Sequence, residues 1–260
     1  MTEAATNGVL ERTASGPWTD LGLTLPIFIA YHLGVVWLPA RNAADWVTHQ
    51  LVQLADHDLT RYVGLTLCVG LVYVGTLWVL GRGQALNGPR FLWISIEGVL
   101  YAIAMRLTAN YAVARLFLEP RIGSGSSAAA ALPAVGDLAL AAPGLAQVAS
   151  GVVMSFGAGF YEEIAFRVGL FGLGWRLLCI LFPLHGAALR GILQSSWALL
   201  CALVFSGWHY VGEFGDRLDL HTFTFRMVCG LVFTAVYRFR GFAPAVWTHS
   251  LYDIWVITAR

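Results

Sequence analysis

One short stretch of the sequence places several ionisable side chains inside an apolar, glycine-rich run. Glu162, Glu163 and Arg167 fall within six residues of one another there. An ionisable side chain near the middle of a membrane-spanning helix costs about 2.5–3.5 kcal/mol, so three together indicate a site rather than tolerated charges. Glu163 and Arg167 are four residues apart, in the order that favours an ion pair along a helix. Glu162 is therefore left available for a partner on another helix.

Two later apolar segments carry further ionisable side chains at helical spacing. Phe205 precedes His209 by four residues, and His249 precedes Asp253 by four. Residues four apart share a helix face, so the Asp253 carboxylate can orient the His249 imidazole. A base, an orienting partner and polar groups that meet developing charge are what hydrolysis needs. Together, the three motifs indicate a hydrolytic site to which three helices contribute.

The composition is that of a polytopic membrane protein. Of the 260 residues, 58% are hydrophobic and 12% are charged, whereas soluble domains average about 25% charged residues. The net charge of +1 shows no basic excess, so nothing suggests nucleic acid as a partner. The four cysteines are widely spaced and lie in apolar segments, so we expect neither a disulfide nor a metal site from them.

Apolar runs long enough to cross a hydrocarbon core of roughly 30 Å recur along the chain. They predict an all-α, polytopic transmembrane bundle of seven or eight spans. The seven runs are 21–38, 62–80, 91–118, a central run that begins near 145, 192–212, 223–239 and 242–258. The run 177–184 is too short to span, so it is either a half-helix or an extension of the central helix. Glycines of the central run, such as Gly157 and Gly159, should let neighbouring helices approach closely.

The predicted organisation has four parts. They are a polar N-terminal tail, N-terminal transmembrane helices, a loop rich in Ala, Gly and Pro, and a catalytic transmembrane core, at residues 1–20, 21–118, 119–144 and 145–260. In the second part, Glu97 and Arg106 are nine residues apart and cannot pair along one helix. We expect them, and His32, to have structural roles.

At these motifs the sequence resembles the CPBP intramembrane proteases, a family that includes type II CAAX prenyl endopeptidases, Abi proteins and myxosortases. The family signatures Glu-Glu-x-x-x-Arg, Phe-x-x-x-His and His-x-x-x-Asn/Asp occur here in family order, between Glu162 and Asp253. The N-terminal half resembles the family only in its apolar spans. Three ordered motifs are far more specific than the first one alone.

The resemblance implies a glutamic mechanism, in which Glu162 and His209 activate a water that attacks a peptide carbonyl, and His249 faces the oxyanion. The supporting positions that match the motifs are Glu163, Arg167 and Phe205. The chain departs from the Asn version of the last motif, because an ionised Asp253 can only accept hydrogen bonds. We therefore assign Asp253 to holding His249 in its donor tautomer and to favouring the imidazolium.

Three further functions are weighed against this one. Two histidines and a glutamate could bind zinc, which would make the chain a zinc-dependent membrane protease, but no His-Glu-x-x-His motif occurs. The chain could also be a non-catalytic multi-pass binding or immunity scaffold, or a transporter whose buried charges carry protons or ions. Against a transporter, no internal repeat links the two halves of the chain.

The proteolytic hypothesis carries definite expectations. We expect no cofactor and no metal, a multi-pass location in a bacterial inner membrane, and the lipid bilayer and a membrane-anchored protein or peptide as partners, cut by CAAX-type or sorting-tail processing. Glu162, His209 and His249 should line one polar pocket that opens to one side, with Glu163 turned away toward Arg167. The base and its helper should each come within about 2.6–3.2 Å of one water. A separation above about 10 Å would favour the scaffold, because no single water could bridge it.

Overall fold

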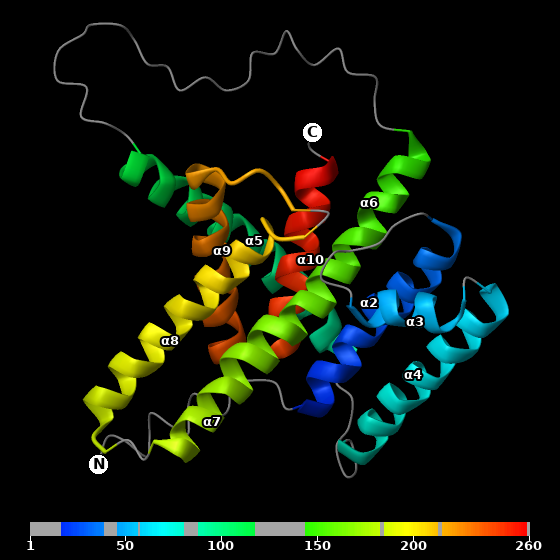
Figure 1. Cartoon of the computed structure of the whole chain (residues 1–260), viewed down its shortest axis with the longest axis horizontal. Coiled ribbons are helices and arrows are strands. Elements are labelled where there is room, and N and C mark those ends of the chain that lie inside the picture. Colours follow the sequence, from blue (N-terminus) through cyan, green and yellow to red (C-terminus); the bar gives the residue numbers. More distant parts are fainter. Residues whose placement is uncertain are drawn as a thin grey trace, which may run out of the picture.

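The computed structural model of the chain is helical in every element of the part that it describes (Figure 1). The structure describes residues 17–38, 46–56, 58–80, 88–117, 144–182, 185–212 and 215–258. The helices are α2 (Pro17–Trp37), α3 (Trp46–Leu54), α4 (Leu59–Leu80), α5 (Gly88–Phe117), α6 (Leu145–Gly157), η2 (Ala158–Leu173), α7 (Gly174–Leu181), α8 (Ala187–Trp208), α9 (Leu220–Arg240) and α10 (Phe242–Thr258). The predicted tail 1–20 and loop 119–144 lie outside these ranges, apart from residues 17–20, which begin α2, and residue 144.

The predicted multi-pass bundle is confirmed. Among the described residues, six helical stretches are long and apolar enough to cross a membrane. The fourth of these is a continuous helix of 37 residues, Leu145–Leu181, made of α6, η2 and α7. The run 177–184 is therefore mostly an extension of the central helix rather than a separate half-helix. With 17 residues, α10 is at the short limit of a spanning helix.

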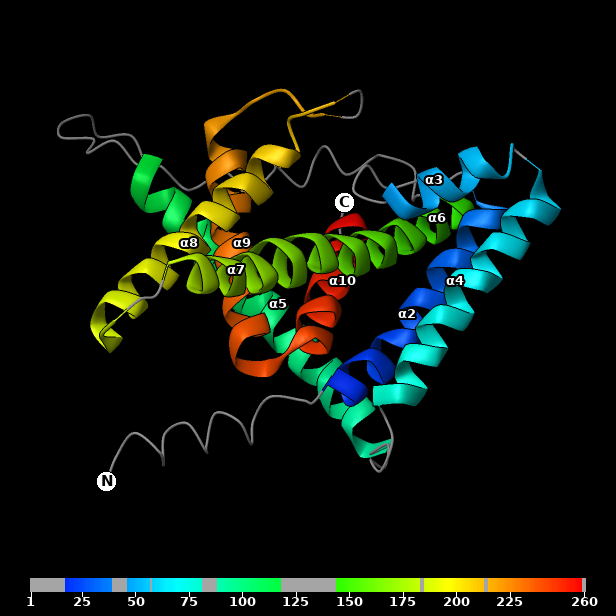
Figure 2. The same cartoon turned by 60° about the horizontal axis from the view of Figure 1, so that its bottom comes forward.

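The long central helix organises the bundle. It runs across the whole molecule, with α2, α3 and α4 to one side and α8 and α9 to the other (Figures 1 and 2). The last helix, α10, packs against α5, η2 and α6, while α8 packs against α9. Both η2 and α10 carry predicted site residues, so their direct contact brings two of the three motifs together.

Close approach between η2 and α10 depends on glycine. A Cβ atom on Gly159 would clash with the Ser250 side chain and would lie 2.9 Å from the Ser250 backbone nitrogen. A Cβ atom on Gly157 would clash with the Tyr31 ring of α2. Small residues at helix contacts in a membrane allow backbones to approach in this way. The predicted role of these two glycines is confirmed.

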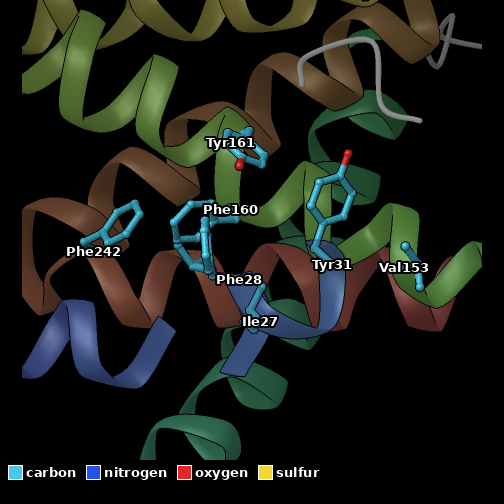
Figure 3. Close-up of a cluster of buried hydrophobic side chains, with 8 residues drawn as sticks. Ile27, Phe28, Tyr31, Val153, Phe160, Tyr161 and Phe242 are labelled. Atoms are coloured by element: carbon cyan, nitrogen blue, oxygen red, sulfur yellow. The ribbon is translucent and has the colours of Figure 1, made fainter. Parts of the chain in front are cut away.

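A buried apolar cluster joins the first helix to the central one (Figure 3). Its members come from α2, α6, η2 and α10, and they are Ile27, Phe28, Tyr31, Val153, Phe160, Tyr161, Phe242 and Val246. Beside it, a buried hydrogen bond of 2.6 Å joins His32 Nε2 to the Tyr161 hydroxyl. His32 is therefore a packed polar residue, as the sequence predicts, and it contacts the residue that precedes Glu162.

Polar contacts from the N-terminal helices hold α10 in place. The buried Asp20 carboxylate of α2 accepts a 2.8 Å hydrogen bond from the backbone N–H of Phe242, the first residue of α10. The indole N–H of Trp247 donates to the Leu23 carbonyl at 2.9 Å. The start of the helix that carries His249 is thus capped by a side chain from more than two hundred residues earlier in the sequence.

Two charged residues of α5, Glu97 and Arg106, make contacts with other helices. Glu97 forms an ion pair with Arg240 of α9, with 2.6 Å between Oε1 and Nη2. The Arg106 guanidinium lies over the Trp255 ring of α10, 4.3 Å from its centre. Both contacts connect α5 to the C-terminal helices, which agrees with the structural roles predicted for these residues.

Candidate active site

Glu162 lies on a stretch of helix whose form differs from the α-helix that the sequence predicts. Residues 158–173 form a π-helix, and at its end the Gly174 N–H reaches the Gly169 carbonyl, five residues back. A π-helix holds more residues per turn, so adjacent side chains diverge less than in an α-helix; it is rare and often occurs at functional sites. Sequence patterns miss this change, because a helix that is apolar on all sides has no clear period to read.

The Glu162 carboxylate faces both predicted histidines. Its Oε2 atom lies 3.9 Å from Nε2 of His209 and 3.8 Å from Nε2 of His249. These distances are too long for direct hydrogen bonds, so the carboxylate and the two imidazoles lie close together without being bonded to one another. The expectation that the three side chains meet well within 10 Å is confirmed. The pocket predicted around them stays a prediction.

Glu163 is closer to the site than the sequence predicts. Its Oε1 atom is 3.1 Å from Nη1 of Arg167, as expected, but it also lies 2.8 Å from Nδ1 of His249. The expectation that Glu163 turns away from the site is therefore wrong. The narrower divergence of adjacent residues in the π-helix explains this, because both carboxylates reach the same imidazole from opposite ring nitrogens.

The contacts of His249 fix the orientation of its ring. Its Nδ1–H donates to Glu163, which leaves Nε2 facing Glu162 and Asp253. Asp253 Oδ2 is 3.5 Å from Nε2. Glu163 thus makes the orienting contact that the sequence assigns to Asp253. A spacing of four identifies residues that share a helix face, but it does not show which groups approach from another helix. Three carboxylates around one imidazole favour its charged form.

Arg167 is a fully buried cation with several partners. Besides Glu163, its guanidinium lies over the rings of Phe205 and Phe233, at 4.3 Å and 4.9 Å from their centres. Its Nη2 also donates to the Gly230 carbonyl at 3.5 Å. Charge pairing and cation–π contact together compensate for the loss of hydration. Phe205 therefore contacts the group that neutralises Glu163, which agrees with its predicted supporting position.

Phe233 of α9 belongs to the site, and sequence reasoning missed it. Its ring is stacked on the His249 imidazole, with 4.5 Å between ring centres and 17° between planes. One more phenylalanine in an apolar, aromatic-rich helix carries no signal of its own. The only hint in the sequence is its position: Phe233 lies three residues after Gly230 and four after Cys229, so the three residues share one helix face.

His209 stands where α8 ends. Its Nδ1–H donates to the Phe205 carbonyl at 2.9 Å, so Nε2 faces Glu162. Its side chain is 25% exposed and that of Asp253 is 28% exposed, whereas Glu162 and His249 are 7% and 6% exposed. Exposure rises toward the end of the bundle at which α8 ends and α9 begins, so the site is more exposed on that side.

The described residues contain no group of three or more His, Cys, Asp or Glu side chains arranged to hold a metal ion. A cavity of about 180 Å³, separate from the candidate site, lies between α2, α3 and α4. Its lining includes Val35, Val52 and Tyr62 and contains no predicted site residue.

Comparison with known proteins connects this site to a protease family. Residues 144–255, a little less than half of the chain, match the family model of Rce1-like type II CAAX prenyl endopeptidases. All seven predicted site residues lie inside the matched region, and helices α2 to α5 lie outside it. The predicted family resemblance is confirmed over this region. No curated protein and no solved structure matches the chain.

Proposed function

We propose that this multi-pass membrane protein, with its Rce1-like region at residues 144–255, is a glutamic-type intramembrane endopeptidase. The family match supports a CAAX-type protease of the membrane. The observation that carries the finer proposal is the position of the Glu162 carboxylate, buried and 3.8–3.9 Å from two imidazoles that come from two other helices. A scaffold has no need for this convergence, whereas activation of a water requires it.

In the proposed reaction each group has a step. Glu162, helped by His209 Nε2, removes a proton from the water, and the oxygen attacks the carbonyl carbon of the scissile bond. The charge that develops on the carbonyl oxygen is met by the protonated Nε2 of His249. Glu162 then returns the proton to the leaving nitrogen as the C–N bond breaks. The products are a new carboxyl group and a new amine, which balances the atoms of one water.

The remaining side chains act through His249. Glu163 holds Nδ1 and Asp253 lies near Nε2, so together they keep the imidazolium charged before the oxyanion forms. Asp253 itself would repel an oxyanion, which is why we give it no direct contact with the reacting oxygen. Arg167 in turn compensates the charge of Glu163, and the rings of Phe205 and Phe233 enclose both ions.

The substrate we propose is a protein anchored in the same membrane, cut in CAAX-type or C-terminal sorting-tail processing. We place the enzyme in a bacterial inner membrane. Because Glu162 is buried among spanning helices, a substrate that diffuses within the bilayer reaches it without leaving the lipid. Residues 145–260 are proposed as the catalytic core, with the helices of residues 21–118 as its support.

The test is a comparison of membrane proteins in a strain that lacks the gene. We expect a small set of proteins to accumulate at the higher mass of an uncleaved form, and the wild-type gene to restore their processing. The Glu162→Gln variant, produced at the same level, should not restore it. Full restoration by Glu162→Gln would overturn the assignment of the base, and an unchanged set of protein masses after deletion would overturn proteolysis.

A further inference from the structure

Both cations near the reacting groups are already held by carboxylates of the site. Glu162, Glu163 and Asp253 surround the His249 imidazolium, and Arg167 is enclosed by Glu163 and two aromatic rings. An approaching carboxylate would be repelled by this set unless a cation stands on its path. Such a cation would have to lie at the end of the bundle at which His209 and Asp253 are partly exposed.

Arg226 is a cation at that end. It lies on α9 seven residues before Phe233, which stacks on His249. Seven residues are two helical turns, so both side chains lie on one face of α9, roughly 10 Å apart along its axis. The Arg226 guanidinium is 5.2 Å from the centre of the Tyr210 ring, and Tyr210 directly follows His209. Arg226 therefore stands beside the more exposed side of the site.

The hydrogen bonds of Arg226 leave one of its nitrogens unused. Nη2 donates to Asp216 Oδ2 at 2.5 Å, but Nη1 is buried and has no hydrogen-bond partner among the described residues. A buried donor without a partner is costly, and a guanidinium is shaped to hold a carboxylate with two parallel bonds. The Asp216 side chain is 59% exposed, so its ion pair with Arg226 is weakened by water and can yield to another carboxylate.

We propose that Arg226 binds a carboxylate of the substrate and thereby selects substrates that carry an anion a short distance from the scissile bond. This inference rests on the proposed proteolytic function. Two sources supply the same chemistry: the C-terminal carboxylate of the substrate chain and the side chain of an Asp or Glu near the cut. The extended peptide that would connect Arg226 to the region of His249, over roughly 10 Å, is about three residues long.

A purely structural role for Arg226 makes a different prediction. Asp216 also donates its backbone N–H to the His209 carbonyl at 2.8 Å, so Arg226 could act only by holding this turn against α9. In that case removal of either partner should disturb His209 equally. If Arg226 binds substrate, removal of Asp216 frees the guanidinium and should leave carboxylate binding intact.

The experiment compares Arg226→Gln with Asp216→Asn, both in the full-length Glu162→Gln protein so that binding is measured without cleavage. The probes are fluorescein-labelled pools of short peptides, randomised over Ala, Leu, Ser and Val. They are made in three forms: with a C-terminal carboxylate, with a C-terminal carboxamide, and with a carboxamide plus one internal Asp. Affinity is measured by fluorescence anisotropy in detergent, and thermal unfolding shows that each variant is folded.

We expect Arg226→Gln to weaken binding of one or both carboxylate-bearing pools by about 10- to 100-fold and to leave the carboxamide pool unchanged. The pool that responds identifies the source of the carboxylate. Asp216→Asn should bind the carboxylate pools as well as, or better than, its parent. Arg226→Lys, which keeps the charge without the planar fork, should give an intermediate loss and replaces Arg226→Gln if that variant is unfolded.

Three results would overturn the proposal: equal effects of Arg226→Gln on all pools, equal losses in Arg226→Gln and Asp216→Asn, or no binding of either carboxylate pool. Cleavage of the same pools by protein with Glu162 intact is measured separately. Carboxylate binding that depends on Arg226 but is never followed by cleavage would refute the hydrolase and leave the binding site standing.

Discussion

Helices α6 to α10 and helices α2 to α5 contribute to this molecule in different ways. The first set carries every predicted site residue and the whole of the family match. The second set carries no chemical motif, yet it supplies the cap of α10 from Asp20, the partner of Arg240 from Glu97, and the Tyr31 ring that packs on Gly157. The comparison teaches that groups which react, and their immediate partners, can be recognised from short motifs, whereas contacts that hold the helices in place also come from helices without a motif.

If this division is correct, variants at the two kinds of group should fail differently. Variants at the reacting groups should lose activity and keep stability, and variants at the positioning groups should lose both together. The following predictions test this difference, beginning with the largest effect.

The largest effect is expected for Glu162→Gln. The change keeps the shape of the side chain and removes the base, so cleavage should fall by about 10²–10⁴-fold while insertion and thermal stability are retained. Turnover is measured on purified membranes with a substrate found in the deletion strain. The matched control is Asp58→Asn before α4, which should keep its activity because its exposed side chain accepts from the Arg61 backbone, away from the reacting groups. Wild-type turnover by Glu162→Gln would show that the base lies elsewhere.

Arg167→Ala should damage both activity and stability. It removes a buried cation that holds Glu163 and lies between two aromatic rings, and breaking a buried pair costs about 3–5 kcal/mol. Thermal unfolding in detergent, followed with a thiol-reactive dye or by light scattering, measures the loss. A variant as stable as wild type would show that Glu163 is satisfied by His249 alone.

Gly159→Ala tests the contact that brings η2 to α10. The added methyl group meets Ser250, so the two helices must separate, which should cost about 1–3 kcal/mol and move His249 away from Glu162. Gly191→Ala is the control, because a Cβ atom there meets nothing within 4 Å. The double variant Gly159→Ala, Ser250→Gly should recover part of the activity. No recovery, with the single variant impaired, would show that the α10 backbone rather than the Ser250 side chain limits the approach.

Asp20→Ala tests positioning from the N-terminal region. The variant loses the side chain that caps α10, which should cost about 0.5–2 kcal/mol and lower activity in proportion to the shift of His249. Asp20→Asn keeps an acceptor and should be milder. The control is Asp58→Ala, whose exposed side chain accepts from the Arg61 backbone at the start of α4, away from the site. Activity unchanged in Asp20→Ala would mean that α10 is held by its other contacts.

Much of the fold and most of the site could be predicted from the sequence. The spans follow from apolar length, and Glu162, His209 and His249 follow from motifs that occur together in a fixed order. The parts that could not be predicted depend on geometry between helices. The π-helix that directs both glutamates to His249 leaves no mark on a sequence that is apolar on every side. Phe233 and the cap from Asp20 are recognised only when distant segments are seen in contact.

The smallest effect is expected from removal of metal ions, and it separates the glutamic mechanism from a zinc-dependent one. Glu162, His209 and His249 present one carboxylate and two imidazoles, which are zinc ligands by type, so donor chemistry alone does not decide between the two mechanisms. The proposed mechanism instead makes the Glu162 carboxylate the base, with Oε2 3.8–3.9 Å from both imidazole nitrogens. We therefore expect activity to survive exhaustive dialysis against a chelator, and elemental analysis of active protein to give far less than one zinc per chain.

Glu162→Gln should be inactive in the same preparations with the metal content unchanged. Stoichiometric zinc that is lost together with activity and restores it on re-addition would move all three residues into ligand roles, because a bound metal rather than the carboxylate would then activate the water.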